Sequence, residues 1–136
     1  MKNIFSRNSG EVLATILRFN EINNSRSDVS KDNEIIQVCA RNFNKKIKIK
    51  AHKHNQIERK IFGTQEVWIL LQGKIKFELF DLDDSLIYYG ILDSGDSITL
   101  FRGGHSLEVI EENTIFYEIK NGPYLGIIKD KKQLDE

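Results

Sequence analysis

Three histidines are the residues of this chain whose types and spacing could do chemistry. His52 and His54 are separated only by Lys53, at the end of an alternating segment, and His105 follows the glycine pair Gly103-Gly104. A strand has a side-chain period of two, so His52 and His54 are expected to point to the same face. Two imidazoles on one face form a chelating pair for Zn, Fe, Mn, Ni or Cu. We expect a different strand to bring His105 close to that pair.

The face on which the histidine pair lies leaves two interpretations open. Lys48 and Lys50 share that face, whereas Ile47, Ile49 and Ala51 occupy the other one. In the first interpretation the isoleucine face packs in the core and both histidines are solvated. In the second, the isoleucine face packs against an outer layer or a partner subunit, or a bulge after Lys50 changes the alternation, and the histidines point inward.

Glu66 opens an apolar segment that continues through Trp68 and Leu70. A buried carboxylate is costly unless it has a partner. The partner is either a metal ion or a basic side chain, for which Lys50 and Arg59 are the candidates.

The elements that must position these side chains are strands. Apolar or alternating segments recur along the chain and are separated by turn signals rich in Gly, Asn and Asp. They are Ile35 to Cys39, Ile47 to Lys50, Val67 to Leu71, Ile75 to Leu79, Leu86 to Leu92, Ser97 to Phe101, Leu107 to Ile110 and Ile115 to Ile119. Residues 12–17 fit either a helix or a strand. About eight short strands predict an all-β sandwich or barrel.

Length and composition set the class of protein. The 136 residues fit one domain, and 40% hydrophobic with 29% charged residues indicate a globular chain. Twenty basic and twenty acidic residues give no net charge, which argues against nucleic-acid binding. Because there is one cysteine, Cys39, and no long apolar run, we expect a cytoplasmic protein without a membrane segment. Cys39 itself is expected to be a small buried hydrophobic residue.

Taken together, these motifs resemble the cupin superfamily. Its first motif corresponds to the pair His52 and His54, followed by Glu66 and, after six intervening residues, by Gly73. Its second motif corresponds to Gly95 to His105. The resemblance implies an all-β, single-domain cupin barrel of jelly-roll type over residues 34–128. It also implies one divalent metal ion (Zn, Fe, Mn or Ni) with four ligands: His52, His54, Glu66 and His105.

The match to the cupin motif departs from the usual pattern at the glutamate. Eleven residues separate His54 from Glu66, where the superfamily has three or four. Glu58 has the expected spacing from His54 but lacks the following glycine, so the ligand is either Glu58 or Glu66. We favour Glu66 because it opens the apolar segment that continues through Trp68 and Leu70, which we expect to be a strand covered on both faces. Glu58 then lies in a lengthened loop at the mouth of the site.

A closer similarity is to small bacterial cupins associated with surface-polysaccharide and nucleotide-sugar pathways. It rests on His54, on Glu58-Arg59, on Gly63 to Val67, on Gly103 to His105 and on Glu118 to Tyr124. Arg59 and Arg102 flank the expected mouth and are candidates to bind a substrate carboxylate or phosphate. Tyr117 is a candidate substrate or catalytic residue, although its alternation with Ile115 and Ile119 favours a core position.

Three functions fit these expectations. The first is a metal-dependent enzyme acting on a sugar or nucleotide sugar, by isomerisation, epimerisation or oxygen chemistry. The second is a non-catalytic small-molecule-binding module. The third is a metal-free sugar isomerase or epimerase with a histidine base and a tyrosine acid. The resemblance further implies a homodimer, with residues 1–33 packing on the barrel or on the partner, and residues 129–136 are expected to form a charged, frayed tail.

Overall fold

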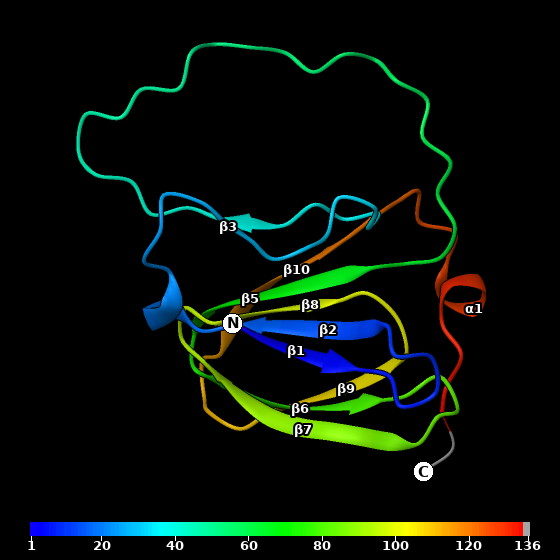
Figure 1. The fold of residues 1–136 in the computed structure, drawn as a ribbon. Coiled ribbons are helices and arrows are strands. Elements are labelled where there is room, and N and C mark those ends of the chain that lie inside the picture. Colours follow the sequence, from blue (N-terminus) through cyan, green and yellow to red (C-terminus); the bar gives the residue numbers. More distant parts are fainter. Residues whose placement is uncertain (135–136) are drawn as a thin grey trace.

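A computed structural model describes residues 1–134, and it consists mainly of antiparallel strands (Figure 1). A large sheet has the order β1-β2-β8-β5-β10 and a small sheet has the order β7-β6-β9. The strands of the large sheet are β1 (Lys2–Phe5), β2 (Val12–Leu17), β5 (Glu66–Gln72), β8 (Ser97–Leu100) and β10 (Ile115–Lys120). Those of the small sheet are β6 (Lys74–Phe80), β7 (Leu86–Asp93) and β9 (Gly104–Val109). The prediction of an all-β chain is confirmed.

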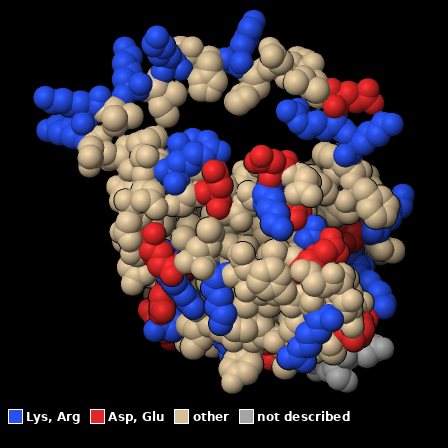
Figure 2. Space-filling view, viewed as in Figure 1, with Lys and Arg blue, Asp and Glu red and all other residues tan. Residues whose placement is uncertain are grey.

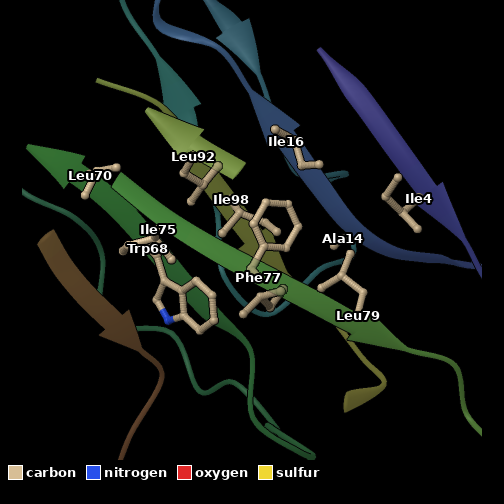
Figure 3. Close-up of a cluster of buried hydrophobic side chains, with 11 residues drawn as sticks. Ile4, Ala14, Ile16, Trp68, Leu70, Ile75, Phe77, Leu79, Leu92 and Ile98 are labelled. Atoms are coloured by element: carbon tan, nitrogen blue, oxygen red, sulfur yellow. The ribbon is translucent and has the colours of Figure 1, made fainter. Parts of the chain in front are cut away.

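The hydrophobic core lies between the two sheets (Figure 3). In β6 the residues Ile75, Phe77 and Leu79 alternate with polar ones and are all buried, as the period of two predicts. They pack against Trp68, Ile98 and other inward-facing residues of the large sheet. Residues 12–17, left open between helix and strand, form β2, which is buried along its whole length.

The outer face of the large sheet is covered by the segment that follows β2. This segment contains a 3-10 turn (η1, Phe19–Glu21) and the short pair β3 (Ser27–Asp28) and β4 (Cys39–Ala40), and it lies over the sheet in Figure 1. Outward-facing residues of the sheet such as Val67 are consequently buried as well. Residues 1–33 thus contribute two strands and part of this cover.

The prediction of a strand at Ile47 to Lys50 is wrong. Residues 41–64 contain no helix or strand, and all of them are exposed. We call this segment the arm; Figure 1 shows that it arches away from the two sheets. The alternating sequence has strand propensity, but a strand also requires a hydrogen-bonding neighbour, and the arm has none among the described residues.

Three smaller expectations also need correction. Of the strand expected at Ile35 to Cys39, only Cys39 pairs, within β4. The Cys39 side chain is half-buried rather than fully buried. A short helix (α1, Ile127–Asp130) precedes the C-terminal tail, and the tail packs on the body through residues 130–134, whereas residues 135–136 lie outside the described part.

Within residues 1–134, no helix has both the length and the apolar character needed to cross a membrane.

Candidate functional site

The two sheets bring Glu66 and His105 together. Glu66 is the first residue of β5 and aligns with Leu100 of β8, whose side chain is in the core. His105 is the second residue of β9 and aligns with Leu79 of β6, also in the core. Directly paired residues point to the same face of a sheet, so both side chains point into the space between the sheets.

Trp68 holds both of these side chains. Its indole N–H donates a hydrogen bond of 2.5 Å to Oε1 of Glu66. The His105 ring packs edge-on against the indole, with ring centroids 5.2 Å apart and an angle of 83° between the planes. The other carboxylate oxygen of Glu66 lies 3.8 Å from Nε2 of His105. Trp68 is 1% exposed, so it forms a rigid floor beneath the pair.

The charge state of His105 is set mainly by its burial. Burial disfavours the imidazolium and lowers the pKa of His105 below its ordinary value, and the ammonium of Lys131 acts in the same direction. The carboxylate of Glu66 opposes this shift. His105 is therefore neutral at pH 7 and able to accept a proton.

One wall of the site is formed by β10. Glu118 aligns with Trp68, and Lys120 aligns with Glu66, so both point inward. Lys120 donates a hydrogen bond of 2.8 Å to Glu118, which lowers the pKa of Glu118 and raises that of Lys120. The expectation that Tyr117 faces the core is wrong: Tyr117 is 60% exposed on the outer face.

A pocket of about 700 Å³ opens above the pair, a volume in the range of small-molecule sites. Glu66, Trp68, His105, Glu118 and Lys120 line it. Residues 130–134 of the C-terminal tail line it too, so this tail closes one side of the pocket instead of fraying. An ion pair of 3.6 Å between Lys132 and Asp84 connects the tail to the turn after β6.

Arg102 lines the same pocket but is engaged in a structural network. Its guanidinium makes two contacts of 3.1 Å with the carboxylate of Glu34, which is buried. It also donates a hydrogen bond of 2.5 Å to the carbonyl oxygen of Val12. Arg102 therefore anchors the covering segment to the large sheet, and little of its hydrogen-bonding capacity is left for a ligand.

The four ligands that the resemblance implies are brought together only in part. Glu66 and His105 meet, whereas His52 and His54 lie on the exposed arm with Glu58 and Arg59. The two arm histidines are neighbours, with ring centroids 5.4 Å apart, and Nδ1 of His52 lies 3.0 Å from the carbonyl oxygen of Lys50.

Residues 1–134 contain no group of three or more His, Cys, Asp or Glu side chains positioned to hold a metal ion. A first-row metal at a His and carboxylate site normally takes at least three protein ligands. The pair of Glu66 and His105 alone thus does not fit the expected metal centre.

Sequence reasoning missed three features of this site. Trp68 was placed on the covered strand, but its hydrogen bond to Glu66 depends on a rotamer that no sequence pattern encodes. The inward direction of Glu118 and Lys120 was obscured by the apolar residues that alternate with them. The tail carried one signal that could have been used: Leu134 is the apolar residue in an otherwise polar end, and its side chain packs against Gly104.

The chain matches no family model, and neither the curated proteins nor the solved structures include one that is detectably similar to it.

Proposed function

We propose that this chain is a small single-domain cupin whose pocket binds a small polar molecule, such as a sugar or nucleotide sugar, and that His105 transfers a proton on that molecule. The observation that carries the proposal is the contact of 3.8 Å between His105 and the buried Glu66 inside the pocket. The carbohydrate class, a role in polysaccharide biosynthesis and a homodimeric state come from the sequence resemblance, and a cytoplasmic location comes from the single cysteine and the lack of a long apolar run. The two antiparallel sheets are compatible with a jelly-roll barrel.

The pair supports proton transfer next to a carbonyl group. The neutral His105 takes a proton from a carbon that is α to the carbonyl, and the resulting imidazolium is stabilised by the negative charge of Glu66. The imidazolium exchanges its proton with solvent and then protonates the neighbouring carbon, while a proton moves from the α hydroxyl to the carbonyl oxygen, giving an isomer; a solvent proton delivered to the opposite face of the α carbon gives an epimer. Neither outcome needs an oxidant or reductant. Trp68 keeps the Glu66 carboxylate in place through its hydrogen bond.

The test is isotope exchange. The protein is incubated in D2O with a panel of aldoses, ketoses and nucleotide sugars, and loss of C–H signals is followed by ¹H NMR. We expect exchange with the wild type, its loss in H105Q, and a decrease of about a hundredfold or more in E66Q, the low end of what a positioned proton-transfer group contributes. Y117F serves as the control, because Tyr117 lies on the outer face and should leave exchange unchanged. Binding without exchange for every sugar would favour the non-catalytic module.

A second candidate function is the metal-dependent one, and it is favoured by the adjacent rings of His52 and His54 on the arm. A metal centre of His52, His54, Glu66 and His105 requires the arm to fold against the pocket. The ion would supply Lewis-acid chemistry at a substrate oxygen when bound. His52 and His54 would act as ligands held by the arm, and Glu66 and His105 as ligands held by the sheets.

Metal content separates the two candidates. Protein purified from its own host is analysed for Zn, Fe, Mn and Ni before and after dialysis against a chelator. The metal candidate predicts about one ion per chain in the wild type and its loss in H54A, which changes only an exposed residue of the arm. Exchange that survives chelation, with no bound metal, contradicts the metal candidate and supports proton transfer by His105 alone.

A further inference from the structure

Removal of a proton next to a carbonyl group puts a negative charge on the carbonyl oxygen, and the pair of Glu66 and His105 does not stabilise that charge. The Glu66 carboxylate favours the imidazolium of His105 but repels a second negative charge on the substrate. Enzymes that carry out this reaction direct a cation or hydrogen-bond donors at the developing oxyanion. If the proposed function holds, on which this inference rests, the pocket must supply such a group.

Four Lys or Arg residues line the pocket, and three of them are paired with carboxylates. These ion pairs join Lys120 to Glu118 at 2.8 Å, Arg102 to Glu34 at 3.1 Å and Lys132 to Asp84 at 3.6 Å. The fourth residue, Lys131, makes no ion pair with any of residues 1–134. Its ammonium nevertheless acts on the interior of the site, because it lowers the pKa values of both His105 and Glu118.

The arm is not another source of positive charge for the pocket. Eight of the twenty Lys and Arg residues of the chain lie on it. Figure 2 shows their side chains along a segment that stands clear of the body. None of these eight residues lines the pocket.

The C-terminal tail fixes the position of Lys131 from both sides. Before it, α1 ends with the backbone N–H of Lys131, which donates a hydrogen bond of 3.0 Å to the carbonyl oxygen of Ile127. After it, Leu134 packs into a notch beside Gly104, where an added Cβ would lie only 2.6 Å from the Leu134 side chain. The tail therefore holds Lys131 at the pocket rather than leaving it on a free end.

We propose that Lys131 is a catalytic residue whose ammonium stabilises the oxyanion of an enediolate formed in this pocket. When His105 removes the proton, the C–H electron pair forms a carbon–carbon double bond and the carbonyl π pair moves to oxygen. Two opposite charges arise, and each has its own partner: Glu66 stabilises the imidazolium and Lys131 stabilises the oxyanion. Both charges disappear when carbon is protonated again, so no oxidant or reductant is needed. The C-terminal tail is then part of the active site.

Lys120 is the rival for this role. It is close enough to Glu66 for that carboxylate to raise its pKa. However, its ammonium donates a hydrogen bond of 2.8 Å to Glu118, and this ion pair would have to weaken before Lys120 could serve an oxyanion. Lys131 has no such partner within residues 1–134, which favours it over Lys120.

Hydrogen exchange in D2O, measured at saturating sugar, tests the role of Lys131. We expect K131M to exchange about a hundredfold or more slowly than the wild type, as for removal of one oxyanion donor. Its KM should change little, because the interaction forms mainly in the transition state. K131R keeps the positive charge and should restore part of the rate. K129M is the matched control, since Lys129 is exposed on the same tail but does not line the pocket.

Binding of an enediolate analogue gives a readout that needs no turnover. The probe is the hydroxamic acid of the sugar that exchanges fastest, which is an anionic mimic of the enediolate. Trp68 is the only tryptophan of the chain and lies at the floor of the pocket, so its fluorescence follows binding. K131M should weaken the hydroxamate at least about tenfold while leaving the affinity for the sugar within about twofold.

The outcomes separate this inference from the proposed function. If K131M exchanges at the wild-type rate while H105Q is inactive, the role of Lys131 is overturned and the proposed function stands. Equal weakening of sugar and hydroxamate in K131M, or a loss of exchange in K120M without one in K131M, also overturns it. A wild type that exchanges none of the sugars overturns both.

Discussion

The hydrogen bond from Trp68 to Glu66 leads to the sharpest stability prediction for the site. W68F removes the indole N–H and leaves a carboxylate that is 5% exposed without its donor. A hydrogen bond to a charged group contributes about 1.5–3 kcal/mol, and the smaller ring leaves a gap in the core. We expect W68F to lower the free energy of unfolding by about 2–4 kcal/mol. E66L strands the buried indole N–H instead and should cost about 1–3 kcal/mol.

The double variant W68F/E66L decides whether this hydrogen bond causes the loss. Removing both partners leaves no unsatisfied group. The losses of unfolding free energy in W68F and in E66L, added together, should therefore exceed the loss in the double variant by about 1.5–3 kcal/mol. The measurement is urea unfolding followed by far-UV circular dichroism. W68F/E118Q is the control cycle, because Glu118 aligns with Trp68 on β10 but makes no hydrogen bond to it, and it should be additive. If W68F/E66L is additive within about 0.5 kcal/mol, the reasoning is refuted.

Three further predictions concern single side chains. The pKa of His105 in the folded chain lies below its ordinary value of about 6.5, so the unfolded chain takes up the proton first as the pH falls. The free energy of unfolding should therefore be constant above about pH 6.5 and decrease below it. Urea unfolding measured at several pH values should show a smaller decrease for H105Q. R102M should cost about 1.5–3 kcal/mol, because it removes the charged partner of Glu34 and leaves that carboxylate only the hydrogen bond from Gln65, and the double R102M/E34Q should recover part of the loss, whereas an unchanged Tm would contradict the network. G73A places a Cβ 2.3 Å from a threonine oxygen at φ +87°, so its Tm should fall further than that of G63A, which has a similar φ but open space.

The strands were predictable where one face of a strand is covered along its length. The alternation of Ile75, Phe77 and Leu79 fixed the face of β6 because apolar residues there have only one favourable side. The same reasoning failed for β10. Tyr117 and Ile119 belong to its more apolar set, yet they face outward and are exposed, because the inward face borders the polar pocket. Local pattern cannot show that a strand lies at the edge of a core.

The arm marks a different limit of sequence reasoning. Ile47 to Lys50 has a clear strand pattern, and residues 1–134 provide no neighbouring strand to pair with it. Propensity describes what a segment prefers once a neighbouring strand is present. The meeting of Glu66 and His105 was expected because the resemblance to the cupin motifs assigned both residues to one site. The role of Trp68 was not, since a side-chain hydrogen bond depends on the rotamer chosen in the packed core.

The arm connects the expected homodimer with the metal candidate, and a mixing experiment tests the two together. If each arm docks on the other chain of a dimer, each metal centre would take His52 and His54 from one chain and Glu66 and His105 from the other. The variant H52A/H54A has an intact body, and the variant E66Q/H105A has an intact arm, so neither should bind metal alone.

Refolded together from denaturant, half of the dimers are mixed, and each mixed dimer contains one complete set of ligands. Metal content should return to about a quarter of the sites of the wild type. Arms that dock on their own chain leave every site in the mixture incomplete, so no metal should return, even though the wild type binds it. The mixture therefore separates exchange from self-docking through metal content alone, without any assay of activity.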